Sequence, residues 1–124
     1  MLQLSLVFLP YMVKNELAMS FLITSQIPKR ELFPGITAAL IHTENLTIAH
    51  VQILNGAVVP EHSHVHEQII NIIEGTFELT VGNETRTVSA GHVVVVPSNI
   101  KHSLVAVTGG KILDVFYPVR EDLK

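Results

Sequence analysis

From residue 36 onward the chain consists of short apolar stretches, most of them closed by glycine, proline or asparagine. Stretches of this length, rich in β-branched residues, are typical of β-strands. Outside residues 14–21, which can form a helix turn or two, no long segment shows a helical apolar period. We expect roughly eight to ten strands at this spacing, which predicts an all-β sandwich or closed barrel.

The strands are predicted from these apolar runs and from the turn residues between them. They are 36–42, 46–54, 67–73, 76–81, 85–88, 92–96, 103–107 and 111–117. In 76–81, Phe77, Leu79 and Val81 alternate with polar residues, as in a strand with one buried face. The stretch 92–96 is apolar along its length, which predicts a buried strand.

One domain accounts for the length of 124 residues. We assign residues 31–124 to the barrel and residues 1–30 to an N-terminal extension, either a strand or a short helix. Residues 1–13 are strongly apolar, but they lack the basic region and cleavage site of a signal peptide. The run is also too short to span a bilayer. The alternatives to a signal peptide are that Met12 or Met19 is the true start, or that this run is a strand that packs in a homodimer. We therefore expect a cytoplasmic homodimer.

Charge and composition exclude several kinds of partner and site. The net charge is -3 and the isoelectric point is near 6.1, so nothing favours a nucleic acid or an anionic membrane as a partner. The chain has no cysteine, which excludes disulfides and thiolate ligands. Any metal site must therefore use nitrogen and oxygen ligands.

The histidines provide such ligands. Seven histidines occur in the chain, and His62, His64 and His66 alternate with other residues in a single segment. On an extended strand, residues i and i+2 point to the same face, so His62 and His64 can converge. Neutral imidazole is the commonest metal ligand. Taken alone, the pair is equally consistent with a histidine-rich surface loop.

Two blocks framed by glycines surround these histidines. The first contains Gly56, His62, His64, Gln68 and Gly75, and the second contains Gly91, Pro97, Asn99 and His102. In order and spacing they resemble the two motifs of the cupin superfamily, over roughly residues 36–117. The resemblance implies a jelly-roll-type antiparallel barrel that holds one divalent metal ion, whether Zn, Ni, Mn or Fe. The implied ligands are His62, His64, Gln68 and His102.

The chain departs from the cupin pattern at two of these positions. Gln68 replaces the usual glutamate, and a neutral amide leaves the full charge on the ion, so we expect weaker binding and stronger Lewis acidity. Asn99 replaces the usual glycine, and asparagine tolerates the left-handed conformation. His66 lies off the motif and is expected at the rim of the site.

The last predicted strand carries a second candidate cluster. Asp114 and Phe116 share one face, so if Phe116 points into the barrel, Asp114 does too. A carboxylate in an apolar interior needs a partner or a function. One interpretation is an Asp114–Arg120 ion pair that holds the tail. The other is an acid/base carboxylate beside the metal, with Arg120 binding a substrate carboxylate.

The histidine segment and this tail together resemble the KdgF subgroup of pectin-degradation cupins. The resemblance implies an enzyme that opens the ring of 4,5-unsaturated uronates, giving the linear 5-keto-4-deoxyuronate. It implies functional roles for Asp114, Phe116 and Arg120, and a small carboxylated sugar as the substrate. The alternatives are a non-enzymatic binding module, or another metal-dependent cupin enzyme such as a dioxygenase or a sugar isomerase.

Overall fold

The computed structural model describes residues 20–124, so most of the predicted N-terminal extension and of the helix turn at 14–21 lies outside the described residues. Within that range the chain forms ten strands and two short 3-10 turns. The strands are β1 (Lys29–Phe33), β2 (Ile36–His42), β3 (Thr47–Ile53), β4 (Val58–His62), β5 (Glu67–Glu74), β6 (Thr76–Val81), β7 (Glu84–Ser89), β8 (Val93–Val96), β9 (His102–Ala106) and β10 (Gly110–Tyr117). The 3-10 turns are η3 (Thr24–Gln26) and η4 (Glu121–Leu123). No helix within residues 20–124 is long and apolar enough to cross a membrane.

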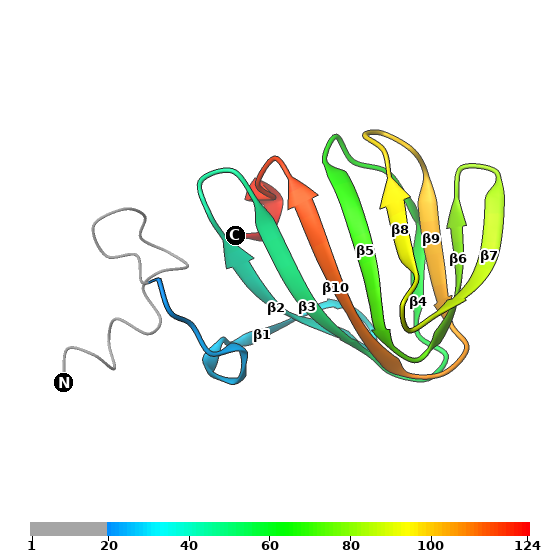
Figure 1. Cartoon of the computed structure of the whole chain (residues 1–124), viewed down its shortest axis with the longest axis horizontal. Helices are drawn as coiled ribbons and strands as arrows, with labels where there is room; N and C mark the ends of the chain where they lie inside the picture. Colours follow the sequence, from blue (N-terminus) through cyan, green and yellow to red (C-terminus); the bar gives the residue numbers. More distant parts are fainter. Residues whose placement is uncertain (1–19) are drawn as a thin grey trace.

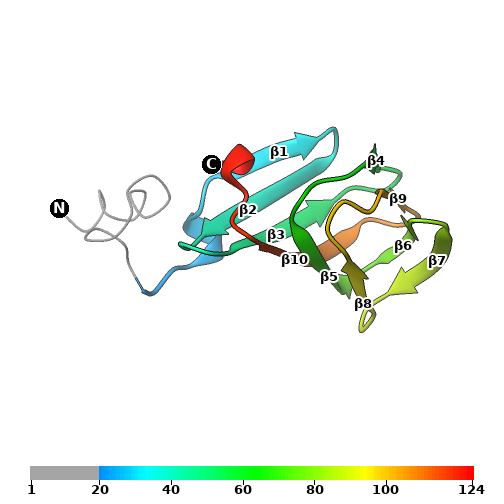
Figure 2. The ribbon, with the colours of Figure 1, turned by 90° about the horizontal axis from the view of Figure 1, so that it is seen from above.

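The strands form two antiparallel sheets that face each other (Figures 1 and 2). The larger sheet has the order β1-β2-β3-β10-β5-β8, and the smaller one has the order β4-β9-β6-β7. Neighbouring strands are often far apart in sequence, as when β10 lies between β3 and β5. This arrangement confirms the predicted all-β, jelly-roll-type cupin barrel.

The space between the sheets is filled by alternate side chains of each strand. In β3 the buried residues are Thr47, Ala49, Val51 and Ile53, the set that the sequence pattern places on one face. Phe77 and Leu79 of β6 enter the same core from the smaller sheet. Because side chains alternate with a period of two, the register of each strand decides which residues reach the interior.

The structure differs from the sequence-based expectation at three strands. The strand β4 was not predicted, and β1 crosses the expected boundary between extension and barrel. The prediction that 92–96 is fully buried is wrong, because Val93 and Val95 are 59% and 61% exposed, whereas Val96 is completely buried. The strand β8 is an edge strand whose outward face is not covered by any described residue. The homodimer stays a prediction.

Two glycines with almost the same backbone conformation occupy different surroundings. Gly75 joins β5 to β6 with φ +96°, and Gly91 joins β7 to β8 with φ +95°. A Cβ on Gly75 would lie 2.5 Å from the carbonyl oxygen of Gly109, whereas a Cβ on Gly91 would meet nothing within 4 Å. Gly75 therefore permits a close crossing of two backbones, and Gly91 only a turn.

These two glycines allow the cost of conformation to be separated from the cost of contact. We expect Gly91→Ala to lower the free energy of unfolding by about 1–2 kcal/mol, because of its positive φ alone. Gly75→Ala should lower the free energy of unfolding by about 1–3 kcal/mol more than Gly91→Ala, since the backbone at Gly109 must move. Urea unfolding of both variants checks this difference. Equal losses would show that the crossing relaxes freely.

Candidate metal centre

Three histidines converge at one end of the barrel. His62 ends β4, His102 begins β9, and the two residues are paired across the strands of the smaller sheet. His64 follows in the connection from β4 to β5. One ring nitrogen from each histidine lies within 4.8 Å of the others, close enough to hold a single ion. The convergence was predicted, but His64 reaches the site from a loop and not from an extended strand.

Backbone carbonyl groups fix the orientation of all three rings. The Nδ1 atoms of the three histidines contact the carbonyl oxygens of Pro60 (2.8 Å), His66 (3.0 Å) and Ile100 (2.8 Å), for His62, His64 and His102 respectively. A carbonyl oxygen only accepts, so each Nδ1 carries the proton and each Nε2 keeps its lone pair. This is the tautomer that a metal ligand requires. The buried Nε2 of His102 has no hydrogen-bond partner among residues 20–124, and this donor set therefore fits a metal ion.

The loop that carries His64 is held by the turn before β9. Asn99 has φ +67°, the left-handed conformation expected for it from the sequence. Its backbone N–H donates to the carbonyl oxygen of His64 at 2.8 Å. The hydroxyl of Ser98 donates to the carbonyl oxygen of Val65 at 2.5 Å. The second glycine-framed block thus positions a histidine of the first.

Gln68 and the histidines belong to one cluster. Gln68 lies in β5, is buried, and points its Oε1 atom to within 3.1 Å of Nε2 of His64. The structure therefore brings all four residues of the predicted ligand set together. His66 stands beside them, with its ring centroid 5.5 Å from that of His64, but it is not part of the group of three.

The electrostatic environment favours the neutral form of His64 and His102. Burial, followed by the nearby Arg120 and His102, lowers the pKa of His64 to about 4. Burial also lowers the pKa of His102. A neutral imidazole can accept a metal ion without first losing a proton, so binding here does not compete with protonation at neutral pH.

A cavity of about 220 Å³ opens beside the cluster and extends into the barrel. His62, Gln68 and His102 line it together with Asp114, Phe116 and Arg120, so the two candidate clusters face one space. Its remaining lining is mostly apolar, with side chains such as Val51, Ile70 and Leu104. An apolar cavity with a few convergent polar groups is typical of a small-molecule site.

Asp114 is the buried acid of this cavity. It lies on β10, is 7% exposed, and its Oδ1 has no hydrogen-bond partner among the described residues. Burial raises its pKa from 3.8 to about 7, although Gln68 and Arg120 oppose the rise. A carboxyl group with a pKa near neutrality can both take up and release a proton.

One interpretation of the sequence was an ion pair between Asp114 and Arg120. In the structure, Arg120 does not pair with Asp114. Its guanidinium group forms a bidentate ion pair with Asp122, with the closest N–O distance 2.8 Å. Its Cζ atom lies 4.7 Å from the centre of the Phe116 ring. Sequence reasoning gave Asp122 no role, because an acidic residue two positions from an arginine is too common to be a signal.

Comparisons with known proteins agree with this geometry. A family model described as a cupin domain matches residues 49–116. The chain is 30% identical over 105 residues to the pectin degradation protein KdgF of Dickeya dadantii, covering 82% of this chain and 96% of that protein. It is similar to the solved structure of KdgF from Halomonas sp., with TM-score 0.80 and 32% identity over 86% of this chain and 100% of that one. An RmlC-like cupin from Shewanella frigidimarina matches with TM-score 0.82 and 27% identity, over 86% and 97% of the two chains.

The raised pKa of Asp114 has a consequence for the stability of the metal-free protein. Between 3.8 and about 7 the unfolded chain has lost this proton while the folded chain keeps it, so stability falls as pH rises. We therefore expect Asp114→Asn to gain stability relative to the unmodified protein across this range. The gain is at most about 1.4 kcal/mol per pH unit. Urea unfolding in the presence of a chelator measures it, and a difference that does not change with pH would contradict the assignment.

Proposed function

Because this chain belongs to the cupin family, we propose that it is a metal-dependent enzyme that opens the ring of 4,5-unsaturated uronate monosaccharides. The product is the linear 5-keto-4-deoxyuronate. The observation that carries the proposal is the presence, in one cavity, of a histidine cluster, a buried acid and an arginine. The similarity to the pectin degradation protein KdgF supports this choice over other cupin activities.

The metal ligands in this proposal are His62, His64, His102 and Gln68. Three neutral imidazoles and one amide oxygen suit a divalent transition ion. When bound there, such an ion supplies Lewis acidity for a carboxylate or a developing oxyanion. Because no ligand is charged, the field of the ion is not reduced within the site.

The other residues of the cavity bind and orient the sugar. Arg120 provides a planar pair of N–H donors for the carboxylate at C6. Phe116 packs beneath the guanidinium group and provides an apolar surface for the ring of the sugar. A substrate held at these two points has its anomeric carbon and its double bond inside the cavity and out of bulk water.

Asp114 is proposed as the group that moves the proton. The anomeric hydroxyl loses a proton, the C1–O1 bond becomes a carbonyl, and the bond from C1 to the ring oxygen breaks. The ring oxygen leaves as an enolate on C5, and a proton added at C4 converts it into the ketone. One proton leaves and one arrives, so a single carboxyl group with a pKa of about 7 can accept the first and deliver the second.

The decisive experiment is turnover of lyase-generated unsaturated galacturonate, followed by NMR. We expect acceleration of ring opening over the uncatalysed reaction, loss of that acceleration with a chelator, and recovery with added metal. Asp114→Asn should retain the metal but lose at least about 100-fold in kcat. No acceleration by protein with metal bound would reject this activity and leave a binding module or a different cupin enzyme. Full activity of the variant would remove Asp114 from the mechanism.

The neutral ligand Gln68 gives a separate prediction about metal affinity. Gln68→Glu places a negative charge next to the ion, and we expect at least about tenfold tighter binding of zinc or nickel. Gln52→Glu is the matched control, because this substitution adds the same negative charge at an exposed position on β3. Titration calorimetry of the metal-free variants measures both affinities. Equal affinities for the two variants would show that Gln68 is not a ligand.

A further inference from the structure

We infer that Asp122 is a positioning residue, which holds one edge of the Arg120 guanidinium group so that the other edge is free for the carboxylate of a bound substrate. The inference rests on the proposed function, because it takes Arg120 as the group that binds the substrate carboxylate. It gives a role to Asp122, to which the sequence analysis assigned none.

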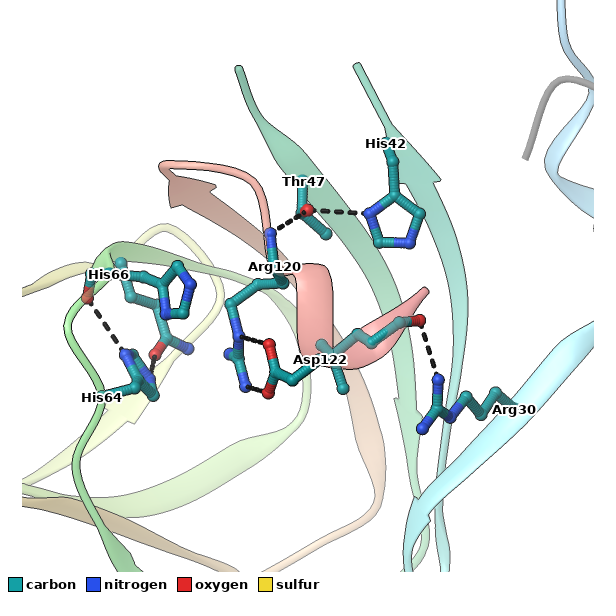
Figure 3. Close-up of polar contacts among 9 residues, drawn as sticks. Arg30, His42, Thr47, His64, His66, Arg120 and Asp122 are labelled. Carbon is teal, nitrogen blue, oxygen red and sulfur yellow. Dashed lines mark hydrogen bonds and ion pairs between the residues drawn. The ribbon is translucent and has the colours of Figure 1, made fainter. Parts of the chain in front are cut away.

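The geometry of the ion pair shows which edge is taken. Oδ1 of Asp122 accepts a hydrogen bond from Nε of Arg120 at 3.0 Å, and Oδ2 accepts one from Nη2 at 2.8 Å (Figure 3). A guanidinium group has five N–H donors, which form two edges that can each bind a carboxylate by two parallel bonds. Asp122 occupies the Nε–Nη2 edge. Within residues 20–124, Nη1 has no hydrogen-bond partner, so the Nη1–Nη2 edge is available.

Two further contacts restrict Arg120. The guanidinium group lies over the Phe116 ring, with Cζ 4.7 Å from the ring centre, and this contact holds the group against the ring. The backbone N–H of Arg120 donates to Oγ1 of the fully buried Thr47 at 2.8 Å, which fixes the start of the Arg120 side chain. This contact with the ring alone leaves the guanidinium group free to rotate over the ring. The bidentate pair with Asp122 removes that rotation.

The turn that carries Asp122 is held by a contact with β1. Asp122 lies in η4, and the carbonyl oxygen of the next residue, Leu123, accepts a hydrogen bond from Nη1 of Arg30 in β1 at 2.7 Å (Figure 3). Leu123 also lines the cavity, so the turn packs against the site that it helps to form. The side chain of Arg120 is only 12% exposed as a result. The position of the carboxylate site is therefore set from the edge strand of the larger sheet.

A different role for Asp122 is that it occupies Arg120 in place of the substrate and must leave on binding. That role would require the substrate to use the same edge of the guanidinium group. The free Nη1–Nη2 edge makes such displacement unnecessary. The two roles predict opposite effects of removing the charge of Asp122, weaker binding for positioning and tighter binding for competition.

The test uses D-galacturonate, which has the carboxylate but not the C4–C5 double bond, and galactose, which lacks both. Titration calorimetry compares the full-length metal-loaded protein with Asp122→Asn and Glu121→Gln. Glu121 is the matched control, since it is the neighbouring exposed acid and pairs with Lys124 at 3.1 Å. We expect Asp122→Asn to weaken galacturonate binding roughly five- to tenfold, and Glu121→Gln to change it less than about twofold. Galactose binding should not differ between the proteins.

Turnover provides a second measurement that a general loss of structure would not reproduce. With the unsaturated substrate, Asp122→Asn should raise KM by a similar factor and change kcat less than about twofold, because the reacting atoms lie elsewhere. Asp122→Glu, which keeps the charge, should restore part of the affinity. The NMR signal of the Arg120 Nε–H group should be present in the unmodified protein and broadened in Asp122→Asn.

The outcomes distinguish this inference from the proposed function. Unchanged or tighter galacturonate binding in Asp122→Asn, or a loss confined to kcat, would overturn the positioning role and leave the proposed function in place. If the unmodified protein binds galacturonate no better than galactose, Arg120 is not a carboxylate site and this inference fails, whereas turnover of the unsaturated substrate still decides the proposed function.

Discussion

The pairing of β10 with β3 on one side and β5 on the other is the constraint on which the site depends. Its register places Asp114 and Phe116 inside the barrel, with Phe116 opposite Gln68 of β5. A shift by one residue would turn both side chains to the outside. The same strand ends just before Arg120, so the acid and the proposed carboxylate site share one scaffold element, which pairs directly with the strand that carries Gln68.

The cavity combines groups that are individually costly to bury. A carboxyl group without a hydrogen-bond partner on one oxygen, as in Asp114, has no structural advantage over an apolar residue. The same holds for the free Nε2 of His102. Each of these atoms points into a region where a ligand can satisfy it. The fold therefore tolerates unsatisfied polar atoms at one end of the barrel, beside a buried core that is made of apolar residues.

Much of this arrangement follows from the sequence, for reasons that can be named. Alternation in 76–81 predicts β6 to the residue, and the resemblance of the glycine-framed blocks to the cupin motifs points to the three histidines that converge. The strand β4 was missed because Pro60 and Glu61 interrupt its apolar pattern. The loop contact from Asn99 to His64 depends on two segments that are far apart in the sequence and meet only in three dimensions. Local patterns carry no information on such contacts.

The histidine and glutamine side chains of the candidate metal centre come from both sheets. His62 and His102 belong to the smaller sheet, and Gln68 belongs to the larger one. An ion bound by all of them would be a cross-link between the layers, at the end where the barrel is otherwise open to its cavity. The layers could then separate only after the ion had left. Thermal resistance would vary with the concentration of free metal, and loss of the ion would loosen the two layers before the chain unfolds.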